Sequence, residues 1–455
     1  MRKPPNVVLI VCDDLGYGDL GCYGSAVNST PTVDRLAAEG LRCTDFYMPA
    51  PVCSPSRGAL LTGCYPRRIG FGSFDGHIVL FPGQAVGLNP EEVTVAKLLR
   101  DAGYATQIVG KWHCGDQPDF LPTRHGFDSY YGLPYSNDMG RQRDNDRSYP
   151  PLPLLRDEEV IQQQPDQTSL TERYAEECVR FLRRNAGRPF FLYLAHMYVH
   201  QPLYTPQRFL RESRNGRYGA AVACIDWVTG VLLHELRTLG LERGTLVIFT
   251  SDNGSRCHGE GGSNGCLRGT KFTTWEGGMR VPCIMRWPGV IPAGSVCREL
   301  VTAMDFLPTL AEIAGARLPG DRVIDGRSIL RLLRAGGAGP GPHDVLFYYF
   351  MDNLEAVRDR RWKLHVRKGG AELRELYDLE ADPGETRNLA DAHPAVVAQL
   401  LERIAACRQD LGDAALGIAG RNVRPIGRVA HADTLTHFDP TYPYFTAEYD
   451  LPERG

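Results

Sequence analysis

Unbroken apolar runs alternate along the chain with segments in which apolar residues recur every three or four positions. The unbroken runs predict strands that are buried on both faces, and the periodic segments predict amphipathic helices. This alternation predicts an α/β fold with a large, mostly parallel central sheet flanked by helices. The predicted strands are 7–11, 104–109, 189–195, 245–250 and 281–287, and the predicted helices are 32–40, 91–101, 170–184 and 220–239.

The pattern changes near residue 336. The Gly/Pro-rich stretch 336–344 predicts a linker between a larger α/β domain, residues 1–335, and a smaller C-terminal α+β domain, residues 345–455. Three strand-like runs predict a short antiparallel sheet, and a periodic segment predicts a helix that packs on it. The runs are 345–350, 356–366 and 373–379, and the helix is 394–411. No pattern assigns the chain after residue 412.

Charge and length exclude some classes of protein. The 455 residues carry 51 Lys+Arg against 54 Asp+Glu, a formal net charge of −3. This balance argues against a nucleic-acid partner, which usually requires a basic excess. No run approaches the roughly 18 apolar residues of a membrane span, so no membrane association is expected. The thirteen cysteines are scattered and form no CxxC pair, which indicates core residues rather than a disulfide framework.

The N-terminal residues bear on location. The apolar run 7–11 is too short for a secretory signal and ends in two aspartates. A cytoplasmic location is therefore the expectation, and a periplasmic, secreted or lysosomal one would follow if a signal has been removed. Nothing in the sequence indicates the oligomeric state.

Polar side chains follow four of the predicted strands. Ligands of open α/β sheets bind outside the carboxyl ends of the strands, so these side chains are expected to meet at one edge. Ionisable groups from several strand ends are what a reaction site requires. The four sets are Asp13 with Asp14, Lys111 with His113, His196 with His200, and Asp252 with Asn253.

Two of these sets offer hard oxygen ligands. Asp13, Asp14, Asp252 and Asn253 suit Ca²⁺ or Mg²⁺ better than zinc, which prefers His and Cys. Adjacent aspartates also repel each other unless a cation offsets their charge. The residues therefore predict a metal site for a hard divalent cation.

Cys53 stands at a predicted helix start. Ser54 is expected to cap the helix, Pro55 suits its first turn, and Gly63 ends it. The free N–H groups there favour an anion, and Arg57 lies one turn further on. A cysteine in this position is expected to have a lowered pKa. Taken alone, these residues fit either a thiolate nucleophile of the phosphatase kind or a helix start without a chemical role.

The chain resembles the type I sulfatases, which belong to the alkaline phosphatase superfamily. Cys53-Ser-Pro-Ser-Arg57, followed by Leu-Thr-Gly63, is similar to their C-x-P-x-R signature. Further blocks occur in the family's order and cover most of the chain up to Leu389: 6–21 (NVVLIVCDDLGYGDLG), 110–115 (GKWHCG), 251–254 (SDNG), 273–282 (TTWEGGMRVP) and 376–389 (LYDLEADPGETRNL). Within the family, 217–219, 261–265 and 321–326 are most similar to N-acetylgalactosamine-6-sulfatases, and next to arylsulfatases A.

The resemblance implies an alkaline-phosphatase-like sandwich and a hydrolase of sulfuric esters, with catalysis in residues 1–335. A maturation enzyme would convert Cys53 to Cα-formylglycine. The substrate would be a sulfated small molecule, or a sulfated sugar of a glycosaminoglycan-type glycan. One Ca²⁺ would be held by Asp13, Asp14, Asp252, Asn253 and the converted Cys53, and the sulfate would lie among Arg57, Lys111, His113, His200 and Lys271. His200 is chosen over His196 because Gln201-Pro202 follows it.

The implied mechanism uses both hydroxyls of an aldehyde hydrate at residue 53. One attacks sulfur; the other, with His113 taking its proton, expels sulfate. His200 or Lys271 protonates the leaving oxygen, and the sequence does not choose between them. One departure from the family is Cys114, where leucine is usual. The alternatives are a formylglycine-dependent phosphonate or phosphodiester hydrolase on the same scaffold, and an unconverted, non-catalytic glycan-binding homologue.

Overall fold

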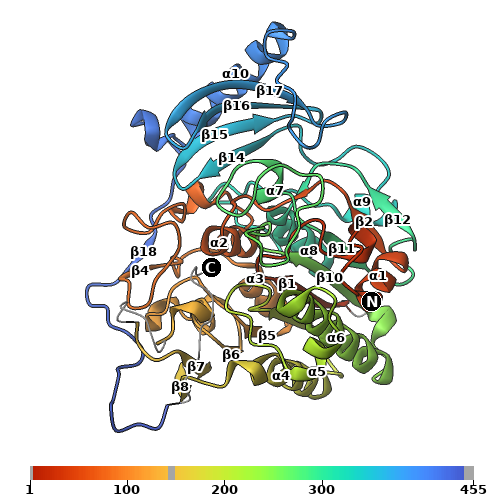
Figure 1. Ribbon diagram of the computed structural model, residues 1–455, viewed down its shortest axis with the longest axis vertical. Coiled ribbons are helices and arrows are strands. Elements are labelled where there is room, and N and C mark those ends of the chain that lie inside the picture. The colour runs from red at the N-terminus through yellow and green to blue at the C-terminus, as the bar shows by residue number, and fades with distance from the viewer. Residues whose placement is uncertain (1–3, 142–148, 445–455) are drawn as a thin grey trace.

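A ten-stranded mixed sheet forms the centre of the protein (Figure 1). The structure is a computed structural model that describes residues 4–141 and 149–444. The strands lie in the order β12-β2-β11-β10-β1-β9-β5-β6-β7-β8. Their bounds are β1 Asn6–Cys12, β2 Leu41–Cys43, β5 Ala105–Gly110, β6 Ser129–Gly132, β7 Pro153–Arg156, β8 Glu159–Gln163, β9 Phe190–Ala195, β10 Thr245–Ser251, β11 Cys283–Arg286 and β12 Ser295–Cys297.

The five middle strands, β10, β1, β9, β5 and β6, are parallel. Towards the edges, β11 and β2 on one side and β7 and β8 on the other run antiparallel to their inner neighbours. The parallel centre confirms the predicted α/β class. The sequence pattern missed the short strands β2, β6, β7, β8 and β12, whose few residues give too little periodicity to identify.

Helices cover both faces of the sheet. Alternate residues of β1 point to opposite sides, so Val8 and Ile10 pack against one helical layer while Val7 and Leu9 pack against the other. The first layer contains α1 Pro31–Ala38, α4 Leu170–Arg184, α5 Gln207–Glu212 and α6 Gly216–Thr238; the second contains α2 Cys53–Thr62, α3 Val95–Asp101, α8 Phe306–Ala314 and α9 Leu330–Arg334. The result is a three-layer α/β/α sandwich.

Two helices differ from their predicted bounds. The segment predicted from residue 91 becomes helical only at Val95, because Thr94 caps the helix and its hydroxyl accepts a hydrogen bond from the Lys97 N–H at 3.1 Å. The helix predicted from residue 220 begins earlier, at Gly216. By length and composition this helix, α6, would pass for a membrane span, but 72% of its most apolar window is buried, as expected of a core helix.

A four-stranded antiparallel sheet and helix α10 form the C-terminal part, at the top of Figure 1. The predicted single strand 356–366 is two strands, because the polar turn 359–361 separates β15 from β16 without a glycine or proline to signal it. The bounds are β14 Leu346–Phe350, β15 Asn353–Arg358, β16 Trp362–Lys368, β17 Ala371–Asp378 and α10 Pro394–Asp410. We retain 1–335 and 345–455 as proposed domains with the linker 336–344; residues 445–455 lie outside the described part.

The unassigned segment after residue 412 returns to the large domain. There β18, Gly427–Arg428, pairs with β4, Val86–Gly87. All thirteen cysteines lie in the described part of the chain and are free thiols. Most are buried, in agreement with the expectation of core residues.

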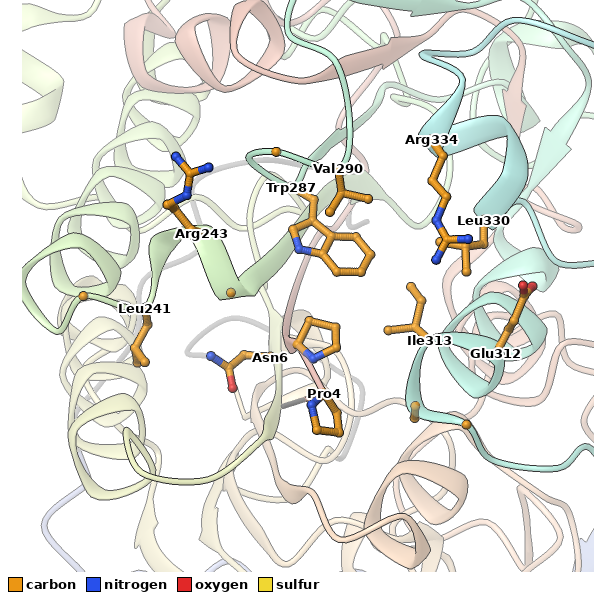
Figure 2. A pocket seen from close by; sticks show the side chains of 16 residues that line it. Pro4, Asn6, Leu241, Arg243, Trp287, Val290, Glu312, Ile313, Leu330 and Arg334 are labelled. Atoms are coloured by element: carbon orange, nitrogen blue, oxygen red, sulfur yellow. The ribbon is translucent and has the colours of Figure 1, made fainter. Parts of the chain in front are cut away.

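A surface cavity of about 810 Å³ lies where β1 and β10 begin (Figure 2). It is lined by Pro4, Asn6, Trp287 and Arg334 among others. Ligands of such sheets bind at the opposite, carboxyl ends of the strands. The cavity contains none of the polar residues predicted to form a site.

Candidate active site

The carboxyl ends of four parallel strands bring the predicted site residues together. Cys12 at the end of β1 is paired in register with Ser251 at the end of β10, so Asp13 and Asp14 lie beside Asp252 and Asn253. Gly110 at the end of β5 is paired with Ala195 at the end of β9, which delivers Lys111, His113 and His200 to the same edge. Sheet register is therefore what assembles residues that are up to 240 positions apart in sequence.

Three carboxylates lie close together in the site. Oxygen atoms of Asp13, Asp14 and Asp252 lie within 4.8 Å of one another, and all three residues are buried. The Asn253 amide donates to Asp14 Oδ1 at 2.7 Å. The Asn253 Oδ1 atom is buried and has no hydrogen-bond partner among the described residues.

Three cations face these carboxylates. Arg57 contacts Asp252 at 2.7 Å, Lys111 Nζ lies 2.5 Å from Asp13, and Lys271 Nζ lies 2.9 Å from Asp14. Each cation is at most 2% exposed. With all six groups ionised their charges sum to zero, so a bound divalent cation would give the site an excess of positive charge that attracts an anionic ester.

Cys53 opens α2 in the middle of this cluster. Its Sγ atom lies 3.6 Å from Asp13 Oδ1, and ligand atoms of Asp13, Cys53 and His200 lie within 4.8 Å of one another. The predicted cap at Ser54 is wrong: Val52 occupies the N-cap position without a side-chain hydrogen bond. The Ser54 hydroxyl instead accepts the Leu80 N–H at 3.2 Å, because a tertiary contact competes for it.

The predicted lowering of the Cys53 pKa is also wrong. Burial raises the pKa of this thiol well above its ordinary value, and although Lys111 and Lys271 act in the opposite direction, Asp13 and Asp252 add to the rise. Loss of water and two nearby carboxylates favour the neutral thiol here. The thiol is therefore protonated at neutral pH, which argues against a thiolate nucleophile of the phosphatase kind.

The pKa values of Asp13 and Asp252 are shifted in opposite directions. Burial and the neighbouring Asp13 raise the pKa of Asp252. Burial opposes ionisation of Asp13 too, but Lys111, His200 and Arg57 outweigh it and hold the pKa of Asp13 below its usual range. Mutual repulsion of this kind is what a bound cation relieves.

Of the three histidines predicted from strand ends, His113 and His200 lie in the site. His113 Nε2 contacts the Leu80 carbonyl at 3.0 Å, and His200 Nδ1 contacts the Gln201 carbonyl at 2.6 Å, with its Nε2 4.0 Å from Asp14. Burial lowers the pKa of both rings. His196 lies apart, with neither ring nitrogen bonded to any described residue, and burial lowers its pKa to about 3.

Backbone geometry at the strand ends is unusual. Asp14 and His113 adopt positive φ angles of 61° and 58°, which non-glycine residues rarely do. Before Lys111, Gly110 has φ 111°, and a Cβ atom there would lie 1.8 Å from the Ala195 carbonyl oxygen. Only glycine allows β5 to end this close to β9, so Gly110 fixes where Lys111 enters the site.

Ser136 is a site residue that the sequence did not reveal. Its hydroxyl lies 3.1 Å from Lys111 Nζ and 3.4 Å from the His200 ring. It follows β6, a four-residue strand at a fifth carboxyl end of the parallel sheet. Assignment of Ser129–Gly132 as a strand would have predicted Ser136 as a candidate.

Asp116, three residues after His113 in the chain, provides a pH-dependent test of burial. It accepts the Gly83 N–H at 2.7 Å, and burial raises the pKa of its carboxyl to about 6. The folded state thus binds this proton more tightly than the unfolded chain, so its contribution to the free energy of unfolding is lost as pH rises from about 4 to about 6. The free energy of unfolding is measured by urea titration at pH 4.5 and pH 7. The difference between Asp116→Asn and wild type is expected to be about 2 kcal/mol more favourable to the variant at pH 7 than at pH 4.5. An unchanged difference would contradict the raised pKa.

Comparison with known proteins identifies the family. The sulfatase family model matches residues 5–316, which is more than half of the chain. The chain belongs to the sulfatase family. Its enzyme class is therefore that of the hydrolases acting on sulfuric ester bonds. The model described as "N-sulphoglucosamine sulphohydrolase, C-terminal" matches residues 270–410.

Individual relatives match the sulfatase over most of its length. Arylsulfatase A from Homo sapiens is 41% identical, over 89% of this chain and 87% of that protein. N-acetylgalactosamine-6-sulfatase from Canis lupus familiaris is 43% identical, over 80% of this chain and 72% of that protein. The solved structure of Ps i-CgsB in complex with k-i-k-neocarrahexaose has a TM-score of 0.79 and 30% identity, covering 89% of this chain and 92% of that one.

Proposed function

We propose that this sulfatase hydrolyses sulfate monoesters of a sulfated sugar or glycan, with Cys53 converted to Cα-formylglycine and one bound Ca²⁺. The observation that carries the proposal is the position of Cys53, buried at the start of α2 with three carboxylates and three cations around it. A protonated thiol has no evident use there, whereas a precursor of an aldehyde does. A formylglycine-generating maturation enzyme is therefore the implied partner.

The residues fit a hard divalent cation. Three carboxylates and the unpartnered Asn253 Oδ1 offer only oxygen, which Ca²⁺ prefers. Asp13, Asp14, Asp252 and Asn253 would hold the ion together with the converted residue 53. When bound, the ion would draw charge from the sulfate oxygens and lower the pKa of an oxygen ligand.

The surrounding residues address the two barriers to sulfate ester hydrolysis. Arg57, Lys111 and Lys271 are held rigidly by carboxylates, so they can offset the negative charge that repels a nucleophile. The hydrated aldehyde supplies one hydroxyl for attack on sulfur and a second for the release of sulfate. His113 accepts the proton of the second hydroxyl, and His200 or Lys271 protonates the leaving oxygen.

Ser136 is expected to support this arrangement through Lys111. Loss of a hydrogen bond to a charged group costs about 1.5–3 kcal/mol, so Ser136→Ala is expected to lower kcat/KM by about tenfold or more. The measurement is steady-state hydrolysis of 4-nitrophenyl sulfate, normalised to aldehyde content. Thr229→Ala is the control, because it removes a buried hydroxyl from α6 that donates to the Ile225 carbonyl at 2.9 Å and has no contact with the site among the described residues. Equal effects of the two variants would contradict a role for Ser136 in the site.

The proposed substrate class rests on the family members named above. One is an N-acetylgalactosamine-6-sulfatase, and one was solved in complex with k-i-k-neocarrahexaose. The test is release of inorganic sulfate from a panel of sulfated mono- and oligosaccharides, with aryl and steroid sulfates alongside. We expect the highest kcat/KM on a sulfated sugar, and a preference for an aryl or steroid sulfate would overturn this choice.

Matched sulfate and phosphate aryl esters separate the proposal from its nearest alternative. A formylglycine-dependent phosphonate or phosphodiester hydrolase would favour the phosphorus ester, whereas we expect the sulfate ester to be preferred. Mass analysis of the peptide that contains residue 53 tests the unconverted, non-catalytic alternative. Conversion of the thiol to an aldehyde lowers its mass by about 18 Da, and a fully unconverted peptide in active protein would contradict the proposal.

A further inference from the structure

Lys271 lies on a loop between the large sheet and the C-terminal sheet. On the side of the large domain, its backbone N–H donates to the Ser255 carbonyl and the Phe272 N–H donates to the Pro51 carbonyl, each at 3.0 Å. The loop continues into the short helix α7, Glu276–Met279, which lies directly below β14 in Figure 1. The position of the Lys271 ammonium therefore depends on how residues 268–276 are held.

Lys363 of β16 binds this loop from the other side. Its Nζ atom donates to the Thr274 carbonyl at 2.8 Å and to Glu276 Oε1 at 3.0 Å. It also lies 3.0 Å from Glu385 Oε1, and Glu385 Oε2 accepts the Glu276 N–H at 2.8 Å. Lys363, Glu276 and Glu385 are all fully buried.

Ring contacts also hold the residues that flank Lys271. Trp275 packs against His365 of β16, with ring centroids 4.1 Å apart. The Arg268 guanidinium lies 3.6 Å from the Trp275 ring centroid and donates to the Glu385 carbonyl at 2.9 Å. Residues on both sides of Lys271 thus contact the C-terminal part of the chain, Trp275 through β16 and Arg268 through Glu385, which follows β17.

A buried set of charges of this kind is satisfied in few arrangements. Each unpaired charge would carry a large desolvation cost, so the loop and the sheet must meet in the geometry that completes every pair. An apolar contact between the same segments would tolerate sliding. The charges therefore do more than join two parts of the chain, because they define one conformation for residues 268–276.

We infer that Lys363 is a positioning residue for Lys271, so that the C-terminal sheet sets the geometry of the active site although the described cluster of carboxylates and cations contains none of its residues. The inference rests on the proposed function, in which Lys271 contacts the sulfate ester. A displacement of about 1 Å at a reacting group can cost up to about 100-fold in rate. Lys363→Met is accordingly expected to lower kcat/KM about tenfold in the converted enzyme.

A double-mutant cycle with Lys271→Ala tests the inference on 4-methylumbelliferyl sulfate, with activity normalised to the aldehyde content at residue 53. Positioning predicts that Lys363→Met costs about tenfold in the wild-type background and less than about twofold once Lys271 is alanine. A purely structural role predicts the same loss in both backgrounds, and this result would overturn the inference alone. If Lys271→Ala leaves activity unchanged, the proposed role of Lys271 falls and the inference falls with it.

Hydrogen exchange supplies a readout that does not depend on activity. The Lys271 and Phe272 amides are expected to exchange faster in Lys363→Met than in wild type. Tyr349→Phe is the matched control, because the Tyr349 hydroxyl bonds to the Gly412 carbonyl at 2.8 Å on the α10 side of the same sheet. The control should change neither the exchange of these amides nor kcat/KM by more than about twofold, and faster exchange in both variants would contradict the inference.

A milder variant keeps the test usable if Lys363→Met does not fold. Arg268→Met acts at the exposed end of the same contact and leaves the buried ion pairs intact. We expect it to lower kcat/KM about threefold in the wild-type background and to have no effect when Lys271 is alanine. Equal losses in both backgrounds would again overturn the inference.

Discussion

Cys53→Ala is expected to abolish hydrolysis of sulfate esters, with a loss on the order of 10³-fold or more in kcat. Removal of a nucleophile that forms the covalent intermediate leaves only binding and charge stabilisation. The substitution removes only the sulfur atom of a small side chain, so the melting temperature should change little. Steady-state assays of 4-nitrophenyl sulfate with folded protein measure the effect.

Cys114→Ala is the matched control for this prediction. Cys114 is a second buried thiol near the site, where burial likewise raises the thiol pKa, but it touches none of the carboxylates of the cluster within the described residues. We expect its loss to change kcat less than about threefold, as is usual for a small side chain outside the reacting groups. Activity of Cys53→Ala above a tenth of wild type would contradict a nucleophile derived from residue 53.

Asp252→Asn is the second variant with a large expected effect. It keeps the shape of the side chain but removes one of three carboxylates and the charge that holds Arg57. Metal ions at such sites supply several kcal/mol of charge stabilisation, so kcat/KM is expected to fall on the order of 10²-fold. Calcium content, measured by mass spectrometry after gel filtration, should fall from one ion per chain to well below one, and millimolar calcium should restore part of the activity.

Stability provides an independent check of the metal. A ligand that binds only the folded state at about 1,000 times its Kd stabilises by about 4 kcal/mol, so calcium should raise the melting temperature of wild type and EDTA should lower it. Asp252→Asn should lose this response. Asp116→Asn removes a buried carboxyl that is not in the cluster and should retain it. A wild-type protein indifferent to calcium and EDTA would contradict the metal site.

The sequence predicted the middle of the sheet better than its edges. The unbroken runs at 7–11, 189–195 and 245–250 are central strands, where burial on both faces leaves a strong apolar signal. Strands at the edges are short or half polar, as in β8, whose residues are half exposed. The hairpin of β15 and β16 was missed because its turn contains charged residues instead of glycine or proline.

The candidate site was predicted as a set but not in its electrostatics. Strand ends identified Asp13, Lys111, His200 and Asp252, because the carboxyl ends of parallel strands must meet. The raised pKa of Cys53 could not be predicted, since it depends on burial and on carboxylates that come from distant strands. The hydrogen bond between Leu80 and Ser54 and the hydrogen bond from Lys363 to the Lys271 loop likewise arise only in the folded chain.

Turnover as a function of aldehyde content tests the central claim most directly. Protein produced with increasing amounts of a formylglycine-generating enzyme, and supplied with calcium, is assayed on a sulfated sugar that the panel identifies as a substrate. The aldehyde fraction at residue 53 is measured on the same samples. We predict that kcat rises in proportion to this fraction and extrapolates to zero without it. Full turnover in samples that retain the thiol, or none in samples that carry the aldehyde and calcium, would contradict the account.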